Sequence, residues 1–194
     1  NLSVEQGKPI SLVGPSGSGK TTLLAIMAGL DLPTSGTVTL LGSQITILDE
    51  DKRAQIRGKD VGFVFQSFHL MPRLTALDNV MLPLEISGDP YSMDKAQEAL
   101  KQVGLSKRAK HFATQLSGGE KQRVAIARSI VNKPKILFAD EPTGNLDKKS
   151  SGSITDLLFS LNALINTTLV LVTHDLSLAE KCDEVYELAE GRLL

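Results

Sequence analysis

One segment near the start of the chain constrains its fold more than any other. Residues 14–21 read Gly-Pro-Ser-Gly-Ser-Gly-Lys-Thr, after the apolar run Ile10–Val13 and before a helical pattern. Glycines at this spacing let backbone N–H groups turn inward around an anion, and the following helix adds the positive end of its dipole. This is the pattern of a P-loop, which needs a strand before it and a helix after it. A glycine-rich turn that only happens to precede a helix is the alternative.

The P-loop pattern assigns a role to each kind of residue in it. Lys20 would bring a point charge to the β- and γ-phosphates of a nucleotide, and the Thr21 hydroxyl would ligate magnesium. We therefore expect the phosphates to be held by the loop and the first helical turn, namely by Gly14, Pro15, Ser16, Gly17, Ser18, Gly19, Lys20, Thr21 and Thr22.

Short apolar runs separated by turns and helical stretches predict an α/β fold with a mostly parallel sheet. Together with the P-loop motif, this pattern resembles the P-loop NTPase (RecA-like) fold. The predicted strands are Ile10–Val13, Val61–Phe65, Ile136–Asp140 and Thr168–Thr173. The segment Gly36–Leu41 reads as a strand of a small antiparallel flap beside that sheet. Between Gln66 and about Val131 only helical patterns occur, interrupted at Gly88, Asp89, Pro90 and Gly104, which predicts an inserted helical lobe.

We expect a single domain over residues 1–194. Residues 1–66 and 132–194 would form the sheet core, and residues 67–131 would form the helical subdomain. The chain begins with Asn1, and Gly191–Leu194 reads as a turn leading into an unfinished strand. We therefore expect the segment to be trimmed at both ends.

Composition narrows the classes of function. With a formal net charge of −1, the chain has no overall basic field to attract nucleic acid or anionic lipid. The single cysteine, Cys182, excludes an internal disulfide and a cysteine-rich metal site. No apolar run approaches the roughly 18 to 20 residues that span a bilayer, so any role at a membrane would come through a partner.

A pair of acids follows the third predicted strand. Asp140 and Glu141 come directly after the apolar residues of Ile136–Asp140, which places them at the carboxyl edge of the sheet beside the P-loop. Asp140 would hold magnesium through its water shell, and Glu141 would orient and deprotonate the attacking water. Strand ends also carry acids that are merely solvated, and the P-loop is what favours the catalytic interpretation.

Residues 116–123, Leu-Ser-Gly-Gly-Glu-Lys-Gln-Arg, narrow the class further. Ser117 and Glu120 form a capping box, so the stretch could simply start a helix that runs to about Val131. Two glycines inside a first helical turn are poor helix formers, and their presence is easier to explain if backbone must approach a ligand closely.

This stretch resembles the signature of ATP-binding-cassette (ABC) ATPases almost letter for letter. The resemblance covers nearly the whole chain, because other landmarks of that family follow in order. Gln66 matches the glutamine that reaches magnesium, Asp147 matches the loop at the dimer interface, and His174 matches the switch histidine near the γ-phosphate. Ser117, Gly118 and Gly119 match the residues that contact a γ-phosphate held by the partner's P-loop. The segments Glu141–Asp147 and Phe65–Phe68 are similar to the lipoprotein-releasing, macrolide-exporting and cell-division group.

The resemblance implies an ATPase subunit with ATP and Mg²⁺ as ligands. It implies a homodimer that sandwiches two ATP molecules and an integral membrane permease as partner, at the inner face of the cell membrane, with export or force transmission favoured over import. An aromatic that stacks on adenine in the family has no counterpart before Phe63, so we expect it on a strand upstream of Asn1.

Two alternatives remain open. A nucleic-acid ATPase would share the motifs, yet the Lys20 to Ser117 interval is too short for a long coiled coil, and no nucleic acid is expected. A non-catalytic regulatory module would typically lack the base.

Overall fold

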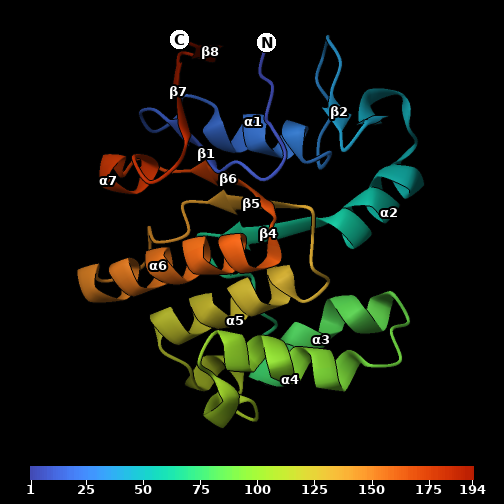
Figure 1. Ribbon diagram of the computed structural model, residues 1–194, viewed down its shortest axis with the longest axis vertical. Coiled ribbons are helices and arrows are strands. Elements are labelled where there is room, and N and C mark those ends of the chain that lie inside the picture. The colour runs from blue at the N-terminus through green and yellow to red at the C-terminus, as the bar shows by residue number, and fades with distance from the viewer.

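The computed structural model describes residues 1–194 and is built on a six-stranded sheet with the order β4-β5-β6-β1-β7-β8 (Figure 1). Its strands are β1 (Ile10–Val13), β4 (Val61–Phe65), β5 (Ile136–Asp140), β6 (Thr168–Val172), β7 (Glu184–Ala189) and β8 (Arg192–Leu193). All neighbours pair in parallel except β7 and β8, which are antiparallel. The predicted α/β fold with a mostly parallel sheet is confirmed, and the three central strands are apolar because both faces of the sheet are covered.

Alternate residues of one strand enter different hydrophobic clusters. In β5, Ile136 and Phe138 face the cluster that contains Leu24 of α1 (Lys20–Met27). Leu137 and Ala139 face a larger cluster formed with helices on the other side of the sheet. This period of two is the geometry of a strand buried on both sides, and it places α1 on one face of the sheet and the helical layer on the other (Figure 1).

The helical lobe consists of α3 (Ala76–Ile86), α4 (Ser92–Gln102) and α5 (Gly118–Ile130), with two short 3₁₀ turns between α4 and α5. Thr75 begins α3 with a capping box to Asp78, and the predicted breakers lie between α3 and α4 and just after α4. The lobe belongs to the same 25-residue hydrophobic cluster as the sheet face beneath it. Lobe and sheet are therefore packed together.

The predicted flap is antiparallel but shorter than the sequence indicated. It comprises β2 (Thr39–Leu40) and β3 (Ser43–Gln44), joined through the left-handed pair Leu41 and Gly42, so residues 36–38 lie outside it. The sequence patterns also missed three elements: β7, α2 (Glu50–Asp60) and α6 (Lys148–Ile165). Strand β7 has one buried residue and α2 has none, so neither carries a strong apolar pattern.

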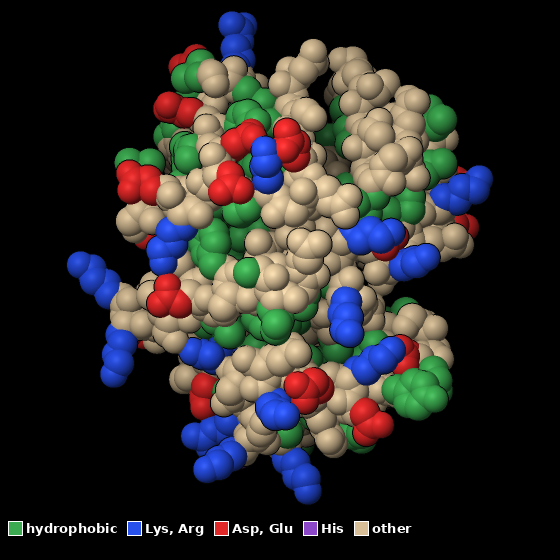
Figure 2. All heavy atoms as spheres, in the orientation of Figure 1, with side chains coloured by type: hydrophobic (Ala, Val, Ile, Leu, Met, Phe, Trp, Pro, Cys, Tyr) green, Lys and Arg blue, Asp and Glu red, His purple; other side chains and the backbone are tan.

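The surface shows no dominant charge. On the face drawn in Figure 2, Lys and Arg side chains are scattered and interspersed with Asp and Glu, as a net charge of −1 suggests. No helix of this structure is both long and apolar enough to cross a bilayer. The last short helix, α7 (Leu176–Ala179), precedes β7 at the edge of the sheet.

Candidate functional site

Four parallel strands end at one edge of the sheet, and each end supplies part of a cavity of about 690 Å³. The P-loop follows β1, Gln66 follows β4, Asp140 and Glu141 close β5, and His174 follows β6. The carboxyl edge of a parallel sheet is the usual ligand site of such folds. The lining residues are Ser16, Gly17, Gly19, Lys20, Thr21, Thr22, Gln66, Asp140, Glu141, Val172 and His174. No Phe, Tyr or Trp side chain is among them.

The P-loop backbone is shaped so that only glycine fits at its first position. Gly14 has a φ of 150°, and a Cβ there would lie 2.1 Å from the Leu188 carbonyl oxygen of β7. Gly19, with a φ of 97°, is the residue before α1, where no side chain caps the helix. The first N–H groups of α1 are therefore left for another acceptor, and a phosphate suits them.

Lys20 reaches back over this loop. Its side chain is largely buried, and its Nζ donates to the carbonyl oxygens of Gly14 at 2.9 Å and Pro15 at 2.8 Å. An ammonium group has three donors, so one remains for an anion in the cavity. Gly14, Pro15 and Ser18 belong to the loop but do not line the cavity.

Thr21 and Asp140 form the candidate magnesium site. The Thr21 hydroxyl donates to Asp140 Oδ2 at 3.0 Å, and Asp140 Oδ1 is buried without any hydrogen-bond partner. No cluster of three or more His, Cys, Asp and Glu occurs in the chain, so an all-protein metal cage is absent. Mg²⁺ typically takes one or two protein oxygens and completes its shell with water and phosphate, so this pair of residues fits Mg²⁺.

Glu141 and His174 lie in direct contact. His174 Nδ1 and Glu141 Oε1 are 2.8 Å apart, with the Glu141 side chain mostly buried and His174 exposed. Glu141 has a left-handed backbone, with φ at 45°, although it is neither glycine nor asparagine. Backbone bonds hold it there, because its N–H donates to Val172 O at 2.9 Å and its carbonyl accepts from Gly144 N at 3.0 Å. Strained residues held by their surroundings cluster at functional sites.

Gln66 is tied to the loop after β5 by two hydrogen bonds. Its Nε2 donates to Asn145 Oδ1 at 3.2 Å, and Asn145 Nδ2 donates to the Gln66 carbonyl at 3.0 Å. Gly144 lies so close that an added Cβ would stand 2.7 Å from Gln66 Nε2. The sequence predicted Gln66 but not its pairing with Asn145, because the two residues are far apart along the chain.

The signature residues lie away from this cavity. Ser117 begins α5 through the predicted capping box: Glu120 N donates to Ser117 Oγ at 3.3 Å, and Ser117 N donates to Glu120 Oε2 at 2.9 Å. Arg108 Nε donates to Glu120 Oε1 at 2.9 Å. These bonds, the one from Ser117 N foremost, lower the pKa of the Glu120 carboxyl. Ser117, Gly118 and Gly119 do not line the P-loop cavity.

Asp147 belongs with the signature rather than with the P-loop. It caps α6 by accepting from Ser150 N at 3.0 Å and from Ser150 Oγ at 2.6 Å. Ser150 in turn lies against Gly119, where an added Cβ would be 3.3 Å from the Ser150 hydroxyl. The structure thus divides the predicted residues into two groups, one around the P-loop and one at the start of α5.

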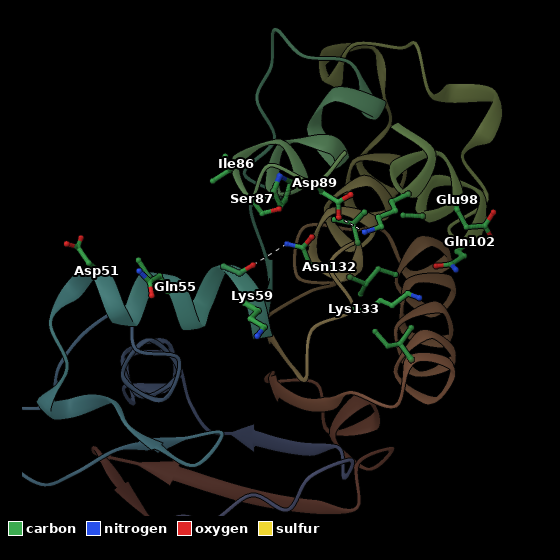
Figure 3. A pocket seen from close by; sticks show the side chains of 18 residues that line it. Asp51, Gln55, Lys59, Ile86, Ser87, Asp89, Glu98, Gln102, Asn132 and Lys133 are labelled. Atoms are coloured by element: carbon green, nitrogen blue, oxygen red, sulfur yellow. Dashed lines mark hydrogen bonds and ion pairs between the residues drawn. The ribbon is translucent and has the colours of Figure 1, made fainter. Parts of the chain in front are cut away.

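A second and larger cavity, of about 1070 Å³, contains none of the predicted site residues (Figure 3). It lies between α2, with Asp51, Gln55 and Lys59, and the lobe, with Ile86 and Glu98 among its lining residues. At its inner side Asn132 Nδ2 donates to the Gly58 carbonyl at 3.2 Å. Its lining combines acids and lysines with apolar side chains such as Ile86, Ile130, Val131 and Ile165.

Comparison with known proteins identifies the family. Residues 1–144 match the family described as ABC transporter. The chain is 55% identical over 194 residues to the uncharacterized ABC transporter ATP-binding protein YbbA of Escherichia coli strain K12, covering 99% of this chain and 85% of YbbA. It is 48% identical over 195 residues to the lipoprotein-releasing system ATP-binding protein LolD of Xanthomonas campestris pv. campestris strain 8004, covering 100% of this chain and 82% of LolD.

A solved structure supports the same family. The dimeric structure of MJ0796, a bacterial ABC transporter cassette, superposes with a TM-score of 0.91 at 43% identity, over 100% of this chain and 86% of that one. A second structure of MJ0796, equally similar, is a dimer in a post-hydrolysis state bound to ADP and Pi. The chain therefore belongs to the ABC transporter family, as an ATP-binding subunit with ABC-type ATPase activity.

Proposed function

We propose that the chain hydrolyses MgATP in a head-to-tail homodimer and thereby moves a membrane permease. The observation that carries the proposal is the contact between Glu141 and His174 at the edge of the P-loop cavity, with Oε1 and Nδ1 2.8 Å apart. A carboxylate there lies near both a phosphate cradle and a candidate metal site. That combination is what phosphoryl transfer to water requires.

Phosphate binding belongs to the loop and to Lys20. The N–H groups at the start of α1 would bind the phosphates, and the remaining Lys20 donor would neutralise the β- and γ-phosphate oxygens. Thr21, Asp140 and Gln66 would hold Mg²⁺. When bound, Mg²⁺ neutralises charge on the phosphates and orients them.

Glu141 is proposed as the general base. Its carboxylate would accept a proton from a water placed in line with the γ-phosphate, since a base must lie within hydrogen-bond reach of the proton it takes. With the imidazole proton assigned to Nδ1, His174 donates to Glu141 Oε1, and Nε2 is then the acceptor nitrogen of the ring. His174 would thus hold the carboxylate in place, and a contact with the γ-phosphate would require a proton on Nε2 as well.

The second group of residues is proposed to act on the other subunit. Ser117, Gly118 and Gly119 offer an exposed helix start, and they lie outside the P-loop cavity of their own chain. The structure of MJ0796 is dimeric, which supports assembly of two copies. In the proposed arrangement the copies face each other, so that this helix start meets the γ-phosphate bound by the partner copy. Asp147 would lie at the same interface.

The membrane partner is proposed to contact the segment that follows Gln66 and the larger cavity. Phe68 and His69 have left-handed backbones, with φ at 60° and 47°, and Arg128 of α5 donates to both of their carbonyl oxygens. The cavity lies between α2 and the lobe, so a polar permease segment seated there would grip both parts of the chain. LolD belongs to a lipoprotein-releasing system, which supports export or force transmission at the inner face of the cell membrane.

The test is phosphate release from MgATP by the chain, by Lys20→Ala, and by both in the presence of the reconstituted permease. Hydrolysis that depends on Lys20 and rises with permease is the expected result. Stimulation by duplex DNA in place of permease would favour a nucleic-acid ATPase, against which the scattered charge of Figure 2 already argues. ATP binding without any Lys20-dependent hydrolysis would favour a regulatory module.

A further inference from the structure

Gln122 makes a buried contact between the signature helix and the turn that carries Glu141. It lies on α5, its side chain is fully buried at 0% exposure, and its Nε2 donates to the Pro142 carbonyl at 2.7 Å. Only this orientation of the amide places a donor opposite the carbonyl, so the assignment of the nitrogen follows from the contact itself. Pro142, also buried, directly follows Glu141.

The other end of the same amide has no partner. Gln122 Oε1 is buried and accepts no hydrogen bond. A buried acceptor without a partner costs free energy, and a methionine of similar length would fill the same space without that cost. The contribution specific to glutamine is therefore the bond to Pro142.

The turn after β5 needs such a bond because it is strained. Glu141 has a φ of 45°, and a residue that precedes proline strongly prefers an extended backbone. Two backbone hydrogen bonds restrain the turn from within the sheet and the turn itself. Glu141 N donates to Val172 O, and Gly144 N donates to Glu141 O. The bond from Gln122 comes instead from the helical lobe.

We propose that Gln122 is a positioning residue for ATP hydrolysis: by holding the Pro142 carbonyl, it keeps the Glu141 carboxylate against His174 and directed at the P-loop cavity. This inference rests on the proposed role of Glu141 as the base. Gln122 lies on the helix that Ser117 begins, so a movement of the signature helix pulls directly on the turn that carries the base.

The test compares Gln122→Met with Val124→Ala in the full chain. Both substitutions lie on α5, and Val124→Ala removes buried volume without touching Pro142. For Gln122→Met we expect kcat to fall roughly 10-fold while the dissociation constant for ATP changes less than about 2-fold. Val124→Ala should lower thermal stability but leave kcat within about 2-fold of the wild type.

A double-mutant cycle separates positioning from general damage. Because Gln122 acts through the Glu141 carboxylate, adding Gln122→Met to Glu141→Gln should cause no further loss of the residual turnover. A full 10-fold further loss, an unchanged kcat of the single variant, or a parallel loss of ATP affinity would overturn the inference. If Glu141→Gln itself retained wild-type turnover, the proposed function of Glu141 would fail instead, which is a distinguishable outcome.

Gln122→Glu provides a second measurement that does not depend on the methionine variant folding. A protonated carboxyl can donate to Pro142 and an ionised one cannot, so the ratio of variant to wild-type turnover should fall as pH rises through the pKa of the introduced carboxyl. Circular dichroism over the same pH range shows that the variant stays folded. A ratio that does not depend on pH would overturn the inference.

Discussion

The P-loop edge of the sheet and the signature end of α5 are built in opposite ways. The edge is assembled within one chain, from the ends of β1, β4, β5 and β6, and its groups converge on one cavity. The signature end is the start of a single helix, where Ser117 and Glu120 hydrogen-bond to each other. Its residues do not line the P-loop cavity of the same chain. Under the proposed function, one chain would supply the phosphate-binding and proton-accepting groups of a site, and a second chain would supply the helix start that closes over it.

The charged side chains of the two regions also differ. At the edge, Lys20 faces the acids Asp140 and Glu141, a balance suited to phosphate and a divalent cation together. At the signature end a carboxylate, Glu120, sits in the first turn of a helix that is proposed to receive a phosphate. Arg108 neutralises it at 2.9 Å. If the signature end receives a phosphate as proposed, this ion pair would offset the repulsion between Glu120 and the phosphate.

Removing the base should produce the largest effect and act on the P-loop edge alone. Glu141→Gln keeps the shape and a hydrogen bond to His174 but cannot accept a proton, so turnover should fall roughly 10²-fold or more. ATP binding should remain and an ATP-stabilised dimer should accumulate. Phosphate release and light scattering measure the two properties, and turnover within a few-fold of the wild type would remove Glu141 from catalysis.

The contrast between the P-loop edge and the signature end can be tested by asking whether two subunits share each ATP site. The expected change in trapped ATP is about 10-fold or more. Lys20→Ala damages only the P-loop edge, and Ser117→Arg damages only the signature end. In a heterodimer of the two, one site carries both defects and the other carries none, so ATP should be occluded again. Occlusion is measured in a Glu141→Gln background, since turnover could require both sites.

The control for that experiment is each variant alone, where every site carries one defect and no ATP should be trapped. Verified heterodimers that fail to trap ATP would contradict the head-to-tail arrangement and would favour two edges that act independently.

The ion pair at the signature end predicts a smaller effect. Arg108→Gln leaves the Glu120 charge uncompensated near the partner's γ-phosphate, so ATP-driven dimerisation of the Glu141→Gln chain should weaken by about 2- to 5-fold. Glu120→Gln in the same chain should restore it, and added salt should shrink the effect. Lys107→Gln is the matched control, because it removes the same charge from the neighbouring exposed residue. Equal weakening by both variants would mean that only net charge matters.

Local motifs explain how much could be predicted from the sequence. The P-loop, the Asp140–Glu141 pair and the capping box of Ser117 are each contained in a few consecutive residues, and chain order alone places strand ends at one edge. The strand β7 was missed because it is exposed on alternate residues and lies near the sheet edge. The flap was overextended because residues 36–38 have strand-like composition but no partner strand.

Contacts between distant segments could not be predicted. Asn145 pairs with Gln66, Gln122 bonds to Pro142, and Arg128 bonds to the carbonyls of Phe68 and His69, yet no spacing rule links any of these pairs. They depend on how the lobe packs against the sheet. The sequence therefore predicted the groups proposed to act on the nucleotide, whereas the groups that hold those residues in place became visible only in three dimensions.

The smallest expected effect concerns the stability of the signature end and follows from the Glu120 carboxyl. The hydrogen bond from the Ser117 backbone N–H lowers the pKa of this carboxyl in the folded chain below its ordinary value. Bonds with the Ser117 and Arg108 side chains act in the same direction. A group with a lowered folded pKa contributes stability above its unfolded pKa, about 4.3 for glutamate, and loses that contribution as pH falls through the folded value. Glu120→Gln retains an acceptor for Ser117 N but does not titrate. We therefore expect the wild type to be slightly more stable than Glu120→Gln at pH 7, with the difference shrinking as pH falls below the unfolded pKa and vanishing once pH is below the folded pKa. Urea unfolding at several pH values, with equal m-values for both chains, measures this difference in stability.

Lys121→Gln, at the next position of the same helix, changes no carboxyl group and should show no such convergence at low pH. If the wild type remained more stable than Glu120→Gln in acid, the Glu120 charge would contribute nothing to the helix cap. The role of Arg108 would then be limited to the partner's phosphate.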